Sequence, residues 1–103
     1  MNNTFGLPER TINELSDYFK TKPEIDLVKI YGSRAKGTYR NGSDIDFAIW
    51  FNAPHSVSRI LFELDELPTP YKFDVTDYEA LTHEGMKKSI DTDGKIFYEK
   101  NFG

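Results

Sequence analysis

Two aspartates and a glycine–serine pair are the residues of this chain that best fit a chemical role. Gly32 and Ser33 follow an apolar run over 27–31, and Asp44 and Asp46 open a second apolar run. Side chains alternate between the two faces of a strand, so Asp44 and Asp46 share one face with Cα atoms about 7 Å apart. Adjacent carboxylates repel each other unless a cation lies between them. Oxygen ligands without histidine or cysteine favour Mg²⁺.

The Gly32-Ser33 pair has the features of a phosphate-binding turn. Glycine lets the backbone approach a ligand without a Cβ in the way. A helical turn that begins at Ser33 leaves free N–H groups, which suit an anion together with the Ser33 hydroxyl. The surrounding segment contains four basic residues and no acidic one between positions 27 and 43: Lys29, Arg34, Lys36 and Arg40. A phosphate site beside a Mg²⁺ site predicts a nucleoside triphosphate as the ligand.

Each half of this pattern also has an ordinary structural interpretation. A Gly-Ser pair is a common connector, and Asp-x-Asp at the start of a strand is frequently a solvated edge or a cap. Gly32 and Gly37 have the spacing of a P-loop, but that motif needs Lys and then Ser or Thr after the second glycine. Thr38 and Tyr39 follow here, which excludes the P-loop. The combination of both halves, ten residues apart, is far rarer than either alone.

The residues G-S-R-A-K-G at 32–37 and S-D-I-D-F-A-I at 43–49 resemble the nucleotidyltransferase superfamily related to DNA polymerase β. They resemble its minimal nucleotidyltransferases (MNT domains) in particular. The family hallmark is Gly-Ser, ten residues, Asp-x-Asp, and a third carboxylate on a later strand. Asp74 lies on the polar face of the run 71–76, where the third carboxylate would lie; taken alone, it is an ordinary surface residue. At Lys36 the family usually has Arg, so the charge is kept but bidentate contact is lost.

The resemblance implies roles for the residues of the motif. The implied catalytic and metal-binding residues are Asp44, Asp46 and Asp74, and the implied phosphate-binding residues are Gly32, Ser33, Arg34 and Lys36. Two Mg²⁺ ions and ATP are expected, with Asp74 on the side of the acceptor hydroxyl and pyrophosphate as the leaving group. Lys72 shares the face of Asp74 and would compete with the metal if it paired with that carboxylate.

The implied function is Mg²⁺-dependent nucleotidyl transfer, with AMP from ATP as the expected group. MNT proteins are typically encoded beside a helical HEPN protein, and some are antitoxins that transfer AMP to a tyrosine of that toxin. A small helical HEPN-type protein is therefore the expected partner. Nearly all of this chain is accounted for by a nucleotide-binding core, which leaves no acceptor domain. Two alternatives remain open: a non-catalytic nucleotide-binding subunit that neutralises the toxin sterically, and a stand-alone small-molecule nucleotidyltransferase.

The elements that must position these residues indicate an α/β (α+β) fold, with a mixed sheet of about four strands flanked by helices. Helices are expected over 7–22, 57–67 and 78–91, a short helical turn at Ser33, and strands over 27–31, 44–51, 71–76 and 95–98. Pro8 is expected in the first turn of the first helix, and Ser56 as the cap of the second.

Composition restricts the remaining possibilities. A length of 103 residues predicts one domain, 1–103. The net charge of −4 and the pI of about 5.1 argue against direct nucleic-acid binding, which usually needs a basic surface. The absence of cysteine excludes disulfides and thiol nucleophiles and is compatible with a cytoplasmic protein. We also expect no membrane segment and no signal peptide, because no apolar run is long enough.

Overall fold

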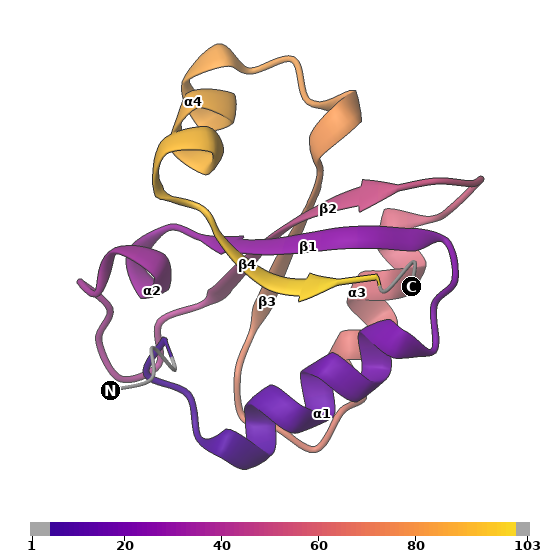
Figure 1. The fold of residues 1–103 in the computed structure, drawn as a ribbon. Helices are drawn as coiled ribbons and strands as arrows, with labels where there is room; N and C mark the ends of the chain where they lie inside the picture. The colour runs from indigo at the N-terminus through magenta and orange to yellow at the C-terminus, as the bar shows by residue number, and fades with distance from the viewer. Residues whose placement is uncertain (1–4, 101–103) are drawn as a thin grey trace.

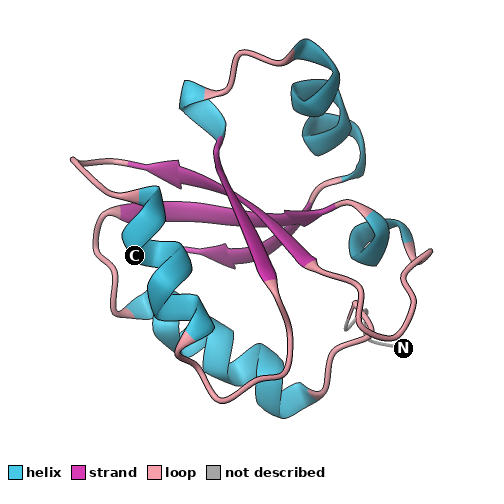
Figure 2. Cartoon of the chain, turned by 180° about the vertical axis from the view of Figure 1, so that it is seen from behind, coloured by secondary structure: helices cyan, strands magenta, loops and turns pink. Residues whose placement is uncertain are grey.

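The computed structural model describes residues 5–100 as a four-stranded mixed sheet with helices on both faces (Figures 1 and 2). The elements in chain order are α1 (Glu9–Lys20), β1 (Ile25–Tyr31), α2 (Ser33–Lys36), β2 (Ile45–Phe51), α3 (Val57–Asp65), β3 (Phe73–Asp77), the 3₁₀ helix η1 (Tyr78–Ala80), α4 (Glu84–Asp93) and β4 (Lys95–Glu99). The strand order is β3-β2-β1-β4. β2 and β3 are parallel, and β1 is antiparallel to both β2 and β4. The predicted α/β (α+β) class and strand number are confirmed.

Helices α1 and α3 cover one face of the sheet and lie side by side in both ribbon views (Figures 1 and 2). Apolar residues recur every three to four positions in both helices, so each presents one apolar stripe to the sheet. Leu15, Phe19, Ile60 and Leu64 are buried there. The Phe19 ring packs edge-on against Phe47 of β2, with the ring centroids 5.2 Å apart. Burying a side chain of this size contributes about 2–3 kcal/mol, so this face supplies the main core.

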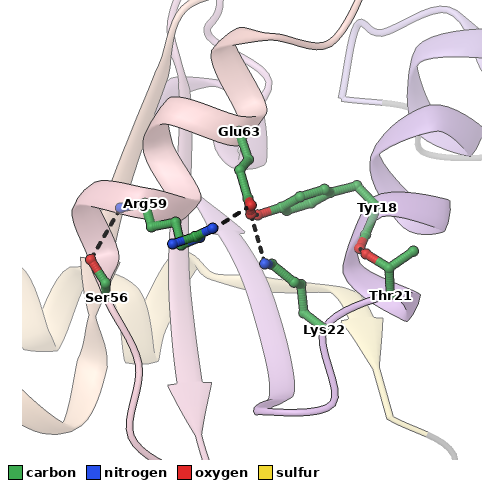
Figure 3. A network of polar contacts seen from close by, with 6 residues as sticks. All are labelled: Tyr18, Thr21, Lys22, Ser56, Arg59 and Glu63. Carbon is green, nitrogen blue, oxygen red and sulfur yellow. Dashed lines mark hydrogen bonds and ion pairs between the residues drawn. The ribbon is translucent and has the colours of Figure 1, made fainter.

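A polar network also joins α1 to α3 (Figure 3). The Tyr18 hydroxyl donates to Glu63 Oε1 at 2.7 Å, and Lys22 Nζ lies 2.7 Å from the same oxygen. Arg59 Nε lies 3.5 Å from Glu63 Oε2. Hydrogen bonds from Lys22 and then Tyr18 hold the pKa of Glu63 below its ordinary value. Ser56 caps α3 as predicted, accepting from the Arg59 N–H at 3.2 Å.

The opposite face of the sheet is covered by η1 and α4, which lie away from α1 and α3 in Figure 1. Tyr31, Ala48 and Ile90 form a second, smaller buried cluster on this face. Trp50 of β2 stacks on Tyr78 of η1, with the centroids 4.3 Å apart. This second cluster anchors the segment after β3 against the sheet.

The segment predicted as one helix over 78–91 consists of two elements, η1 and α4, so that prediction is wrong. The stacking of Tyr78 on Trp50 holds the chain against the sheet immediately after β3, and a new helix then begins. His83 caps α4, because its Nδ1 accepts from the Met86 N–H at 3.0 Å. Residue spacing alone does not reveal a ring contact between distant segments.

Several predicted boundaries shift by a few residues. Pro8 is the N-cap of α1 rather than part of its first turn. β1 begins at Ile25, earlier than predicted, and α3 ends at Asp65. β3 begins at Phe73, where its pairing with Ile45 of β2 begins. The starts of β1 and β3 are set by pairing with another strand, and local sequence patterns do not show that pairing.

Candidate active site

The predicted site residues converge at one end of the sheet. β1 and β2 are antiparallel, so Gly32 and Ser33, which follow β1, lie beside the start of β2. Asp44 immediately precedes β2, and Asp46 is its second residue. Asp46 and Asp74 are register partners on the parallel strands β2 and β3, which are about 4.8 Å apart. The fold therefore brings together the two halves of the motif and the third carboxylate.

These residues lie on the face opposite the main core. Phe47 and Val75, which neighbour the aspartates in sequence, belong to the core under α1 and α3. Alternation along each strand turns Asp46 and Asp74 to the other face. Asp46 is partly buried, while Asp44 and Asp74 are exposed. The carboxylates thus border open surface, where a ligand can reach them.

Gly32 is required by both its conformation and its neighbour. Its φ of 75° lies in the left-handed region, where a side chain is strained. A Cβ built on Gly32 would also collide with Asp46 Oδ2. The backbone before α2 therefore lies directly against the Asp46 carboxylate, which places the predicted phosphate site and the predicted metal site side by side.

Burial and the neighbouring carboxylates both raise the pKa of Asp46. Burial, followed by the charges of Asp74 and then Asp44, raises the pKa of Asp46 from 3.8 to about 6. The charge of Arg34 acts in the opposite direction. The ionised form of Asp46 is thus destabilised, and a cation placed near it would stabilise that form.

The carboxylate oxygens of this site fit the way in which proteins usually bind Mg²⁺ together with a nucleotide. Among residues 5–100, no group of three or more His, Cys, Asp or Glu side chains is arranged so that it could hold a metal ion. Mg²⁺ commonly takes one or two carboxylates and completes its shell with water and substrate phosphate oxygens. A pair of repelling carboxylates beside a glycine turn open to phosphate is consistent with that mode.

The two predicted phosphate-binding cations lie in different environments. Lys36 is exposed at the end of α2. Arg34 is only 3% exposed, and its guanidinium donates to the carbonyl oxygens of Ser43 and Phe5. The phosphate role of Arg34 stays a prediction, and this burial argues against it. Lys36 is the more exposed of the two.

Sequence reasoning missed a bridge beneath the carboxylates. Tyr31 Oη lies 3.1 Å from Thr76 Oγ1, so the two hydroxyls join β1 to β3 across β2. Burial raises the pKa of Tyr31, and the charges of Asp74 and Asp46 add to this effect. Strand alternation could have placed Tyr31 on the Asp46 face only once the β1–β2 register was known. Across the described part of the chain, no ion pair joins Lys72 to Asp74, so that carboxylate is not masked.

Within residues 5–100, no helix has the length and apolar character needed to cross a membrane.

Comparison with solved structures identifies the same fold in toxin–antitoxin complexes. A toxin–antitoxin structure with AMP-PNP contains a chain that matches at a TM-score of 0.64 and 22% identity, covering 91% of this chain and 75% of the other. The MntA–HepT complex matches at 0.68 and 15%, covering 90% and 74%. The complex of a tri-AMPylated Shewanella oneidensis HEPN toxin with its MNT antitoxin matches at 0.66 and 16%, covering 89% and 72%. At these identities the likeness establishes the fold.

Comparison by sequence establishes the family. No curated protein matches the chain. The family model described as polymerase beta nucleotidyltransferase matches residues 13–102, which include both halves of the motif and the third carboxylate. This chain is therefore a member of the polymerase beta nucleotidyltransferase family.

Proposed function

We propose that this protein is the antitoxin of a toxin–antitoxin pair and transfers AMP from ATP, with Mg²⁺, to a tyrosine of a HEPN-type partner. The observation that carries the proposal is the convergence of Asp44, Asp46 and Asp74 with the Gly32 turn at one open end of the sheet. Family membership supports nucleotidyl transfer as the reaction class.

In this proposal the residues of the motif have defined tasks. Gly32 and Ser33 bind the β- and γ-phosphates through backbone N–H groups and the hydroxyl. Asp44 and Asp46 would hold two Mg²⁺ ions, Asp74 would bind the ion nearer the acceptor hydroxyl, and the exposed Lys36 would neutralise the leaving pyrophosphate. Mg²⁺, when bound there, would neutralise charge at the phosphates and stabilise the attacking and leaving oxygens.

The bond changes follow from an in-line displacement. The acceptor oxygen forms a bond to the α-phosphorus while the bond from that phosphorus to the bridging oxygen breaks. Pyrophosphate leaves with the electron pair of the broken bond. The acceptor proton passes to Asp74, which is exposed beside Asp46 and is not paired with Lys72. Catalysis is then mostly positioning and electrostatic stabilisation.

The acceptor and the partner rest on the neighbours and on the family resemblance. One solved complex with the same fold contains a tri-AMPylated HEPN toxin with its MNT antitoxin, and another is a toxin–antitoxin structure with AMP-PNP. A tyrosine suits the chemistry, since its phenol has a pKa of about 10 and is favoured as phenolate near a cation. Because ATP is the donor, we place the reaction in the cytoplasm.

Intact-mass spectrometry of a co-expressed HEPN-type protein, encoded by the neighbouring gene, tests this function. We expect the mass of one or more AMP groups on the partner when it is produced with the wild type, and none with Asp44→Asn. The variant should still fold, because Asp44 is exposed. Neutralisation of the partner by both proteins without added mass would favour the alternative of a non-catalytic, steric antitoxin. AMP on a small molecule, with no bound partner, would favour a stand-alone enzyme.

A further inference from the structure

The ten residues between the Gly-Ser turn and the first aspartate form a loop closed by one buried arginine. We infer that Arg34 is a positioning residue, which fixes Ser33 and Asp44 relative to each other by binding the Ser43 carbonyl. Its consequence for metal and nucleotide rests on the proposed function, whereas its effect on the loop does not.

The loop folds as two turns placed back to back. α2 is a single turn that ends at Gly37, whose φ is 81°, and the Thr38 N–H donates to the Ser33 carbonyl at 3.0 Å. A second turn follows, in which the Ser43 N–H donates to the Arg40 carbonyl at 3.0 Å. The Arg40 N–H in return donates to Ser43 Oγ at 2.8 Å. These hydrogen bonds each lie within one turn, and none of them connects one turn to the other.

The Arg34 side chain connects the two turns. Its Nε and Nη2 donate to the Ser43 carbonyl at 3.2 and 3.0 Å, a fork that holds one oxygen from two directions. Arg34 follows Ser33 directly, and Ser43 directly precedes Asp44. The guanidinium therefore connects the residue after the phosphate-binding turn to the residue before the first carboxylate.

The surroundings of Arg34 hold its side chain in place. Nη1 donates to the Phe5 carbonyl at 2.9 Å, which adds the segment before α1 to the same clamp. The Tyr39 and Tyr71 rings lie 5.3 and 5.1 Å from the guanidinium carbon. No carboxylate forms an ion pair with Arg34 within residues 5–100. The charge is thus satisfied by carbonyl oxygens and aromatic faces, and the planar fork of a guanidinium suits this arrangement better than an ammonium group.

The test compares Arg34→Lys with Arg40→Lys, the same chemical change at an exposed arginine of the same loop, whose hydrogen bonds within residues 5–100 use only its backbone. Hydrogen exchange is measured first on the free chain. We expect amides of residues 38–45 to exchange about tenfold faster in Arg34→Lys, because charge-assisted bonds to a carbonyl are lost, and to be unchanged in Arg40→Lys. Wild-type exchange in Arg34→Lys would overturn the inference.

The second measurement is the Mg²⁺ concentration needed for ATP to raise the melting temperature. A positioning residue predicts a several-fold higher Mg²⁺ requirement in Arg34→Lys, with ATP binding in EDTA unchanged. A phosphate ligand predicts weaker ATP binding with and without Mg²⁺, and that result would contradict our assignment. If the wild type itself shows no Mg²⁺-dependent ATP binding, the proposed function fails while the exchange result still decides the role in the loop. If Arg34→Lys does not fold, Tyr39→Leu removes one aromatic face, and an unchanged exchange rate there overturns the inference.

Discussion

Replacing Asp46 by Asn should stabilise the free protein while removing its response to Mg²⁺ and ATP. The difference between the ordinary pKa of 3.8 and the pKa of about 6 in the folded protein is equivalent to about 3 kcal/mol. Asp46 is only partly buried, so solvent screening reduces the stabilisation expected from Asn to about 1–1.5 kcal/mol. For a domain of this size, 1 kcal/mol raises the melting temperature by about 4–8 °C.

The pH dependence of this effect has a definite sign. A raised carboxyl pKa means that the folded protein binds a proton more readily than the unfolded chain between pH 3.8 and about 6. The stability of the wild type therefore falls as pH rises through this window, and the penalty is complete above it. The advantage of Asp46→Asn should be largest above about pH 6 and should disappear near pH 4.

The assay is thermal unfolding of wild type and variant at several pH values, with and without Mg²⁺ and ATP. Asp65→Asn, at an exposed position on α3, is the matched control and should change neither property. An Asp46→Asn variant that is less stable than wild type at neutral pH, or that keeps the full response to Mg²⁺ and ATP, would refute the electrostatic reasoning.

Three further changes test separate contacts. Gly32→Ala should lower the free energy of unfolding by about 1–3 kcal/mol and remove Mg²⁺-dependent ATP binding, because the added Cβ displaces the Asp46 carboxylate. Gly42→Ala is the control and should keep that binding, because Gly42 has a similar φ but open space around it. For His55, the pKa is raised by a backbone hydrogen bond and by its carboxylate partner on β3. The wild type should therefore be more stable than His55→Gln, with the whole difference in free energy of unfolding present below about pH 6.5 and declining as pH rises. A difference that does not change with pH would contradict the pairing. Tyr18→Phe should lower the free energy of unfolding by about 1 kcal/mol in urea denaturation, since Glu63 loses one donor, and an unchanged midpoint would show that this bond contributes nothing.

The fold class and the polar faces that carry the aspartates could be predicted because they depend on local patterns. Alternation along 44–51 and 71–76 places Asp46 and Asp74 on polar faces without knowledge of the partner strands. Their direct opposition on parallel strands depends on sheet order, and β2–β3 pairing joins segments separated by a helix. The pattern leaves that order open.

The features that sequence reasoning missed all depend on contacts between distant segments. From sequence, Arg34 is predicted to bind phosphate, and its burial could not be foreseen because it requires the Phe5 and Ser43 carbonyls to meet at one point. The Tyr31–Thr76 bridge needs the β1–β2–β3 register. Residue type predicted the charge of Arg34 correctly, but only the tertiary structure specifies the groups that this charge contacts.

Transfer of label from ATP tests the central claim most directly. The protein and its co-expressed HEPN-type partner are incubated with Mg²⁺ and ATP labelled either at the α- or at the γ-phosphate. We expect the partner to acquire label from α-labelled ATP only, and to acquire none in EDTA or with Asp44→Asn. Label from γ-labelled ATP, or α-label that persists with Asp44→Asn, would contradict nucleotidyl transfer at this site.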